Sequence, residues 1–522
     1  MPEPGDRLWR FHGGIRLDGH RSLSAGKPLD AVPLSDRFVV PVQQHIGQPG
    51  EVLVEAGQQV FKGEPLTRIK EYVAAPVHAP TSGTVVAIEE RPVPHPSGLA
   101  GLCVVIEADH RDDWGDARLE PLSDYTALSP ARIRRRVRQC GIVGLGGAAF
   151  PTAAKINPLH EQRIHTLVLN GAECEPYITC DDTLLRHFAQ EVLEGARILL
   201  HALDNPERCI IAVEEDMPEA YEAVREALGG VASGPFRLVR VPAIYPTGSE
   251  KQLIHVLTGL EVPADGLPAD IGVICQNVGT VRAVYRAVVH GEPLIERIVT
   301  VTGRGVRRPG NHWVRLGTPV EEVIRHAGGY VEDVEWLLMG GPMMGIALHE
   351  DVVPTVKATN CLLVARKGEL PAAGTALPCI RCGECVRVCP ARLLPQEMYR
   401  LAKAREFDRI QEYDLFDCIE CGCCAYVCPS HLPLVHYYRY AKSEIRDLER
   451  EREAAERARR RHEFRLERLE REKRERAARM ARKKAAVSAA SGKQERQAAI
   501  EAAVKRAEAK KTARRQTAQT ED

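Results

Sequence analysis

The chain has 522 residues, enough for three to five domains, and its 71 basic and 71 acidic residues give a formal net charge of zero. The charges are unevenly placed: residues 441–522 carry 26 basic and 16 acidic residues, whereas the other 440 residues carry 45 and 55. This distribution excludes a uniformly basic nucleic-acid-binding protein. Because no aromatic platform accompanies the basic tail, we expect no nucleic acid among its partners.

The hydropathy pattern predicts neither a signal peptide nor a membrane-spanning helix. Residues 1–19 lack the apolar stretch of a signal peptide. The longest apolar run, Trp336–Leu348, contains glycine and proline and is shorter than the roughly 20 residues that a span requires. We therefore expect contact with a membrane only through partner proteins or the basic tail.

Residues 39–107 contain short apolar runs separated by glycine and proline, a pattern that resembles the lipoyl/biotinyl sandwich. In that family the lysine that carries the prosthetic group lies eight residues before a proline that corresponds to Pro80 here. The residue at that position is Tyr72, and the nearest lysine, Lys70, is two positions away. The segment is thus predicted to be a structural or docking module without covalent lipoate.

A glycine-rich loop, residues 140–151, leads into a helical pattern that ends at Lys155. Such a loop exposes backbone N–H groups, and a helix start adds positive partial charge, so phosphate is the expected ligand. A tight glycine turn without a ligand is the alternative that the loop alone leaves open.

Beyond this loop, buried strands alternate with helical patterns, which predicts a parallel α/β sheet. The predicted strands are 166–169, 209–213, 237–241 and 272–275. Polar residues or glycines follow each strand, at the sheet edge where ligands bind in open α/β folds. After the first strand these residues are Asn170, Glu173 and Glu175.

Nine of the 16 cysteines lie between Cys379 and Cys428, in two runs that both fit C-x2-C-x2-C-x3-C-P and are offset by 39 residues. In such pairs the fourth cysteine of one run ligates the cluster held by the other run. The predicted ligands are Cys379, Cys382, Cys385 and Cys428 for one [4Fe–4S] cluster, and Cys418, Cys421, Cys424 and Cys389 for the other. Cys423 aligns with Glu384 and is predicted to be a bystander. Two zinc sites or unligated thiols are the alternatives, but structural zinc prefers separated C-x2-C pairs.

Four motifs occur in the same order as in the flavin subunit of respiratory complex I, which binds FMN and oxidises NADH. They are the glycine loop through Lys155, Asn-Gly-Ala-Glu-Cys-Glu-Pro from Asn170, Tyr-Pro-Thr-Gly-Ser-Glu from Tyr245, and Asn-Val-Gly-Thr from Asn277. With the two ferredoxin-type runs and the basic tail, residues 11–440 resemble the RnfC (RsxC) family, peripheral subunits of Rnf ion-translocating ferredoxin:NAD oxidoreductase complexes.

The resemblance implies roles for individual residues. FMN or nucleotide phosphate would be held by Gly144, Gly146, Gly147 and Lys155, and the flavin would be contacted by Asn170 and Asn277. Glu173 would face the nicotinamide as the catalytic residue, with Glu250 nearby. The chain departs from the complex I motifs at Leu145, Ala149, Ser249 and Gly279, where that flavin subunit has arginine, glycine and two acidic residues.

The predicted fold class is a multidomain α/β protein with small β and ferredoxin modules. Its predicted parts are an N-terminal segment with a lipoyl-like sandwich (1–110), a parallel α/β FMN/NADH domain (125–295), a β-grasp module that resembles soluble-ligand-binding domains (296–368), a two-cluster ferredoxin-type domain (369–440), and a charged helical or disordered tail (441–522).

The first functional hypothesis is a peripheral electron-transfer subunit on the cytoplasmic side of the cell inner membrane. It would exchange electrons between NAD(H), through FMN, and two [4Fe–4S] clusters. Integral-membrane and iron–sulfur or flavin partner subunits, with ferredoxin as a further partner, would couple this transfer to Na+ or H+ transport. A non-catalytic iron–sulfur wiring subunit with an empty flavin fold is one alternative, and a soluble corrinoid reductase of similar layout is another.

Overall fold

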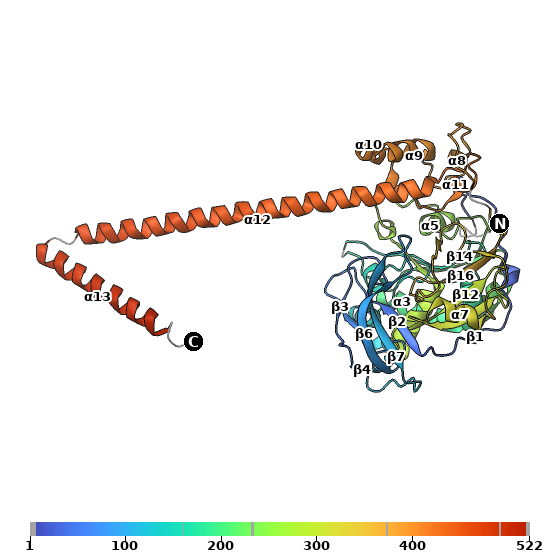
Figure 1. Cartoon of the computed structure of the whole chain (residues 1–522), viewed down its shortest axis with the longest axis horizontal. Helices are drawn as coiled ribbons and strands as arrows, with labels where there is room; N and C mark the ends of the chain where they lie inside the picture. The colour runs from blue at the N-terminus through green and yellow to red at the C-terminus, as the bar shows by residue number, and fades with distance from the viewer. Residues whose placement is uncertain (1–6, 160, 231–233, 372–373, 490–491, 518–522) are drawn as a thin grey trace. The chain divides into compact units, whose positions relative to one another are not determined.

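The computed structural model describes residues 7–159, 161–230, 234–371, 374–489 and 492–517. The chain divides into a body, Met1–Lys442, and a tail, Ser443–Asp522. The body contains three main sheets and a helical cysteine-rich module, whereas the tail contains only helix in its described part (Figure 1). The multidomain fold class is as predicted.

A small sandwich of strands forms the first module of the body. It consists of a four-stranded antiparallel sheet, in the order β2-β7-β6-β4, and a two-stranded antiparallel sheet, β3-β5. The bounds are β2 (Arg37–Pro41), β3 (Glu51–Val52), β4 (Gln59–Val60), β5 (Thr67–Arg68), β6 (Gly83–Pro92) and β7 (Ala100–Ala108). Phe38, Leu66 and Ile106 are fully buried between the layers. Tyr72, at the position of the lipoyl lysine, accepts a hydrogen bond from Asn157 Nδ2 (2.9 Å) and so contacts the next module.

The second module is the predicted parallel α/β domain. Its sheet has the order β10-β9-β8-β11, and all three pairings are parallel. The elements are α1 (Pro130–Gln139), α2 (Thr152–Lys155), β8 (Thr166–Gly171), α3 (Cys180–Ala202), β9 (Arg208–Glu214), α4 (Pro218–Gly229), β10 (Phe236–Val241), α5 (Glu250–Thr258), β11 (Val273–Asn277) and α6 (Val278–Val289), with single 3-10 turns at Tyr125–Ala127 and Pro268–Ile271. Helices α3 and α6 pack so closely that a Cβ on Gly195 would lie 2.1 Å from the Val281 carbonyl oxygen.

A six-stranded mixed sheet forms the β-grasp module, in the order β1-β13-β12-β16-β14-β15. The bounds are β1 (Asp30–Ala31), β12 (Glu296–Thr302), β13 (Gly310–Arg315), α7 (Val320–His326), β14 (Val334–Met339), β15 (Ile346–Ala347) and β16 (Cys361–Arg366). Strand β1 comes from the N-terminal segment, which the prediction groups with the sandwich in residues 1–110. It follows the 3-10 turn Arg21–Leu23 and pairs in parallel with β13 of this sheet.

The cysteine-rich module is built from short helices and precedes the tail. Its elements are α8 (Glu384–Arg387), α9 (Pro395–Ala404), α10 (Phe407–Gln411), a 3-10 turn (Leu415–Asp417), α11 (Cys423–Tyr426) and the first turns of α12 (Leu434–Ala489). Tyr438 of α12 is buried, and its hydroxyl donates to the Pro395 carbonyl oxygen (2.7 Å).

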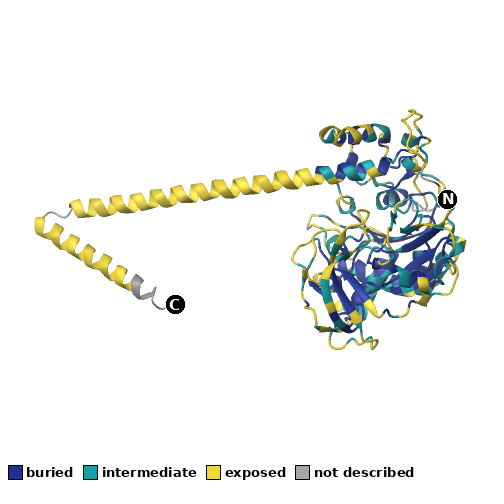
Figure 2. Cartoon of the chain, viewed as in Figure 1, coloured by how far each residue is buried: buried dark blue, intermediate teal, exposed yellow. Residues whose placement is uncertain are grey.

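The tail consists of the rest of α12 and of α13 (Lys493–Thr517). Every side chain from 446 to 488 and from 492 to 513 is exposed, as the yellow helices of Figure 2 show. The tail is rich in residues of high helix propensity, and side chains one turn apart form ion pairs, such as Arg457–Glu453 (3.1 Å) and Arg460–Glu456 (2.6 Å). Together these stabilise the helix without tertiary packing. Residues 518–522 of the predicted tail lie outside the described residues. Among those described, no helix combines the length and apolar character needed to cross a bilayer.

A fully buried lysine joins three modules of the body. Lys357, between β15 and β16, donates from Nζ to the carbonyl oxygens of Pro76 in the sandwich (2.8 Å) and Gly141 in the α/β domain (2.7 Å). Burial lowers the pKa of the Lys357 ammonium to about 7. Neutral and charged forms can both donate to these carbonyls, but the charged form is desolvated without a compensating anion in contact.

We predict that Lys357 makes the stability of the body rise with pH between about 7 and its ordinary pKa of 10.5. In this window the unfolded chain binds a proton that the folded chain does not, with a slope of at most about 1.4 kcal/mol per pH unit. Thermal unfolding of Lys357→Met, which leaves two carbonyls unpaired, should show a larger loss relative to wild type at pH 9 than at pH 6.5.

The exposed Lys27→Met variant is the matched control and should show no such widening. A constant difference between wild type and Lys357→Met across this pH range would contradict the prediction.

Candidate redox site

The two cysteine runs fold into two cavities that exchange their fourth cysteine. One cavity is lined by Cys379, Cys382 and Cys385 of the first run together with Cys428 of the second. The other is lined by Cys418, Cys421 and Cys424 together with Cys389. The structure therefore brings each predicted ligand set together. Four converging thiol groups are the donor set that a [4Fe–4S] cluster requires, so the residues fit this cofactor.

The duplication is visible in the backbone as well as in the sequence. Arg381 and Glu420, 39 residues apart, have φ values of 56° and 59°, and Gly383 and Gly422 both have φ of 80°. Left-handed residues at these positions turn the chain sharply between consecutive cysteines, which lets three side chains point to one cavity. The spacing of the motif thus reflects a loop shape that occurs twice.

The two cavities differ in exposure. Cys379 and Cys382 are exposed, whereas Cys389, Cys421 and Cys424 are buried. The second cavity adjoins the α/β domain, because the Tyr245 hydroxyl donates to the Cys421 carbonyl oxygen over 2.6 Å. Cys423 is fully buried beside Tyr245 and also lines this cavity, so its predicted bystander role stays a prediction.

The glycine loop lies against the carboxyl end of β11. The Leu145 N–H donates to the Thr280 hydroxyl (2.8 Å), and a Cβ on Gly146 would come within 3.4 Å of Asn277. A Cβ on Gly147, where φ is 106°, would meet no atom within 4 Å. The helix after the loop, α2, has a single turn, so the predicted contribution of a helix dipole is small.

Lys155 and Glu250 come from the two sides of this region and form an ion pair of 2.6 Å. Two buried polar atoms of residues that border these segments, the Thr152 hydroxyl directly after the glycine loop and the Gln276 amide nitrogen directly before Asn277, lack a hydrogen-bond partner. Unpaired polar atoms and an open glycine cradle fit a polar, phosphate-bearing ligand such as FMN.

The two asparagines predicted to contact the flavin have partners within the protein. Asn170 Nδ2 donates to the Gly248 carbonyl oxygen (2.8 Å). Asn277 Oδ1 accepts from the Gly279 N–H (2.9 Å) and caps α6, while its Nδ2 donates to Asp181 Oδ2 (2.6 Å). Both residues therefore shape the loops at the sheet edge, and their contact with a flavin stays a prediction.

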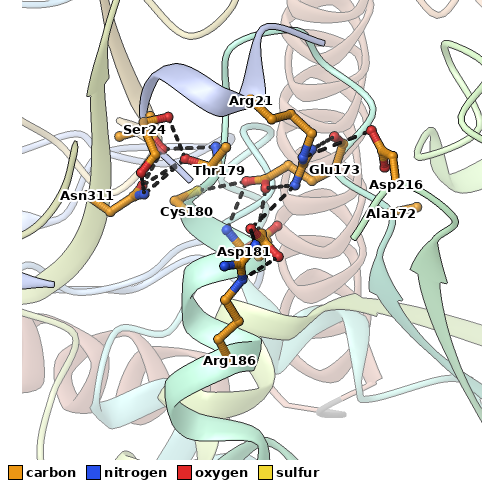
Figure 3. A network of polar contacts seen from close by, with 12 residues as sticks. Arg21, Ser24, Ala172, Glu173, Thr179, Cys180, Asp181, Arg186, Asp216 and Asn311 are labelled. Atoms are coloured by element: carbon orange, nitrogen blue, oxygen red, sulfur yellow. Dashed lines mark hydrogen bonds and ion pairs between the residues drawn. The ribbon is translucent and has the colours of Figure 1, made fainter. Parts of the chain in front are cut away.

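Glu173 lies beneath the N-terminal segment rather than at an open surface, and its side chain is 5% exposed. Its Oε1 accepts from the Asp181 N–H (2.8 Å) at the start of α3, and its Oε2 accepts from Arg21 Nη2 (3.3 Å), as Figure 3 shows. Burial raises the pKa of Glu173, against the opposing effect of Arg21. In this arrangement Glu173 is a buried cap of α3 that anchors the N-terminal segment.

The same segment is held at a second point of the network in Figure 3. The Ser24 and Thr179 hydroxyls are 2.7 Å apart, and Asn311 Nδ2 donates to Thr179 Oγ1 (2.9 Å). Residues from the N-terminal segment, from the N-cap of α3 and from β13 thus meet in one buried polar cluster. Sequence reasoning missed Arg21 and Ser24, because no local pattern links them to partners more than 150 residues away.

Glu175 bridges the α/β domain and the β-grasp module. Its Oε1 accepts from the N–H groups of Met343 (2.7 Å) and Met344 (3.0 Å). Burial raises the pKa of Glu175 to about 7. Gly341 is required beside it, since a Cβ there would lie 2.2 Å from the Glu175 side chain.

Four family models match the chain, in the order of its modules. They are the RnfC barrel sandwich hybrid domain (residues 9–111), the Nuo51 FMN-binding domain (137–286), the SLBB domain (298–347) and the 4Fe-4S dicluster domain (378–432). Among curated proteins, the C subunit of the ion-translocating oxidoreductase complex of Pseudomonas aeruginosa is 48% identical over 458 residues, which cover 88% of this chain and 58% of that protein. The protein of the same name from Vibrio cholerae is 48% identical over 459 residues, which also cover 88% of this chain and 58% of that protein.

The chain belongs to the RnfC family. It spans 58% of the length of these two relatives. Among solved structures, a chain of an NAD+-reducing [NiFe]-hydrogenase in its H2-reduced state is similar to this one with a TM-score of 0.42 and 18% sequence identity. The match covers 63% of this chain and 65% of the hydrogenase chain.

Two departures of this RnfC-family chain from the complex I motifs have visible consequences. Ala149 replaces glycine at a φ of 48°, a left-handed conformation that costs a non-glycine residue about 1 kcal/mol. Gly279 replaces an acidic residue, and a Cβ at this position would lie 3.6 Å from Asp181 Oδ1. A carboxylate at position 279 would be repelled by the carboxylate of Asp181, and glycine avoids this repulsion.

We predict that Cys389→Ser lowers the iron content from about eight to about four atoms per chain, because Cys389 completes the second cavity. Cys423→Ser should retain about eight, since the offset of 39 residues leaves it without a counterpart. Iron and sulfide quantification after anaerobic reconstitution checks both variants. Equal losses in the two would show that Cys423 is needed for the second cluster.

A second prediction concerns the ion pair under the N-terminal segment. Arg21→Gln leaves the Glu173 carboxylate buried without its cation, and breaking a buried pair costs about 3 kcal/mol. Because the pKa of Glu173 is then raised further, stability is lost as the pH rises through the folded-state pKa, and the defect should be larger at pH 8 than at pH 5.5.

Thermal unfolding of Arg21→Gln, of Arg21→Gln/Glu173→Gln and of the exposed control Arg16→Gln measures this effect. The double variant should recover part of the loss, and the control should match wild type. A defect in Arg21→Gln that is independent of pH would contradict the assignment.

Proposed function

We propose that this chain is an electron-transfer subunit of an ion-translocating oxidoreductase complex that passes electrons between NAD(H), FMN and two [4Fe–4S] clusters. The proposal rests chiefly on one observation: the second cysteine cavity lies directly beside the FMN-type domain, through the hydrogen bond from Tyr245 to Cys421. A flavin domain and a cluster module packed against each other provide a short route for single electrons.

In this proposal the sheet edge of the α/β domain holds FMN. Gly144, Gly146 and Gly147 would present backbone N–H groups to the phosphate, and Lys155 would add its charge. Asn170 and Asn277 would border the flavin ring through their remaining hydrogen-bonding capacity. When bound, FMN supplies the conversion of a two-electron hydride donor into single electrons. Lys155 is already paired with Glu250, so phosphate binding would draw its ammonium away from that carboxylate.

The unequal exposure of the two cavities supports an order of electron transfer. The buried cavity of Cys389, Cys421 and Cys424 faces the flavin domain and would exchange electrons with FMN. The exposed cavity of Cys379 and Cys382 would exchange them with a partner protein. By its family, the chain would act in an Rnf-type complex, with integral-membrane, iron–sulfur and flavin partners and with ferredoxin. It would lie on the cytoplasmic side of the inner membrane, and its partners would couple transfer to Na+ or H+ transport.

A second candidate function is a wiring subunit whose clusters are used while its flavin fold stays empty. One observation favours it: Glu173, predicted to face the nicotinamide, is buried under Arg21. For NADH to reach Glu173, the N-terminal segment would have to move. The relatives from Pseudomonas and Vibrio are named as members of a complex, which gives the corrinoid-reductase alternative no support.

The decisive experiment is anaerobic reconstitution of the full chain with iron, sulfide and FMN, followed by flavin and iron quantification and titration with NADH. We expect about eight irons and one flavin per chain, with the flavin bleached by NADH. Lys155→Met should lose flavin but keep its iron, whereas the exposed Lys70→Met should lose neither.

About eight irons without retained flavin or any response to NADH would favour the wiring subunit. Fewer than about four irons would refute the two-cluster assignment itself.

A further inference from the structure

Two histidines and an aspartate converge in the β-grasp module, on residues that neither the cysteine cavities nor the glycine loop uses. Asp30 lies in β1 and is the parallel-strand partner of His312 in β13. His326 is the last residue of α7, and Arg308 donates from Nη2 to its carbonyl oxygen (2.6 Å), which holds this helix end. Three separate elements of the chain thus each deliver one polar side chain to the same point.

The geometry of this cluster is compact. His312 Nδ1 contacts Asp30 Oδ1, and His326 Nε2 lies 3.1 Å from the other carboxylate oxygen, Asp30 Oδ2. The two imidazole rings meet edge to face, with centroids 5.1 Å apart. One nitrogen from each histidine and one oxygen from the aspartate all lie within 4.8 Å of one another. A cation placed between them could therefore reach all three with side-chain adjustments alone.

The burial of the three side chains differs in a way that suits a metal site. His312 is 8% exposed and His326 22%, whereas Asp30 is 54% exposed. The nitrogen donors are thus sheltered, while the carboxylate faces water at the mouth of the site. A neutral imidazole donates a lone pair to a metal through its unprotonated ring nitrogen.

We propose that Asp30, His312 and His326 bind a divalent transition-metal cation, with zinc as the best match. Two imidazole nitrogens and one carboxylate oxygen are ordinary zinc ligands, and a fourth position remains for water on the exposed side. Calcium and magnesium prefer sets made entirely of oxygen, so they match this set poorly. Bound here, the cation would cross-link the N-terminal strand β1 to β13 and to the end of α7.

The competing account is that no cation binds, and that Asp30 simply accepts a hydrogen bond from each ring. Both accounts use the same three side chains, so substitutions that merely destabilise the module cannot separate them. Direct detection of the metal and of its ligand atoms can.

The test uses the full chain with its clusters reconstituted anaerobically, incubated with zinc sulfate and then desalted. We expect about one zinc per chain with iron unchanged, and zinc K-edge absorption should show a first shell of nitrogen and oxygen at about 2.0–2.1 Å. Asp30→Asn and His326→Gln, which alter the two more exposed ligands, should lose most of this zinc. The exposed control His349→Gln should keep it.

Zinc should also raise the thermal unfolding midpoint of wild type, but not of the two ligand variants. The proposal fails if wild type retains no zinc, or if the ligand variants retain as much as wild type. It fails equally if the shell consists of sulfur at about 2.3 Å, which would place the zinc on cysteines. Because the absorption spectrum of wild type distinguishes these ligand sets by itself, the test holds even if a variant folds poorly.

Discussion

The parallel order of four strands is the constraint on which the rest of the body depends. Because β10, β9, β8 and β11 run in one direction, their polar ends lie at a single edge of the sheet. Glu173, Glu175, Tyr245 and Asn277 all extend from that edge. Each contacts a different neighbour: the N-terminal segment, the β-grasp module, the cysteine module and the glycine loop. A sheet with mixed strand directions would scatter these contacts over two edges.

Much of the fold could be predicted because its signals are local. Runs of buried aliphatic residues locate the four strands of the parallel sheet within one or two positions. The two cysteine runs carry their own loop geometry, including the left-handed turns at Gly383 and Gly422. The convergence of Cys428 with the first run could also be predicted, since repeat spacing and the reach of a cluster constrain each other.

What the sequence did not reveal are contacts made by single residues over long distances. Arg21 reaches Glu173 across 152 positions, and Lys357 reaches Pro76 across 281, with no periodic pattern at either end. Glu173 illustrates the effect on the site. Its motif predicts a ligand-facing carboxylate, but the segment that covers it carries no signal of its own. The roles of Asn170 and Asn277 toward a flavin stay predictions for a similar reason, since their amides have partners within the protein.

The short strand β1 has a consequence for how the protein behaves as a polypeptide in solution. It pairs with the outer side of β13, whose backbone would otherwise form the free edge of the remaining five-stranded sheet. Free edges of this kind recruit strands from other molecules. Two residues near the beginning of the chain therefore protect the sheet against self-association. An amino-terminal deletion that removed β1 would expose the backbone edge of β13. The protein would then lose solubility through self-association before it lost its redox activity.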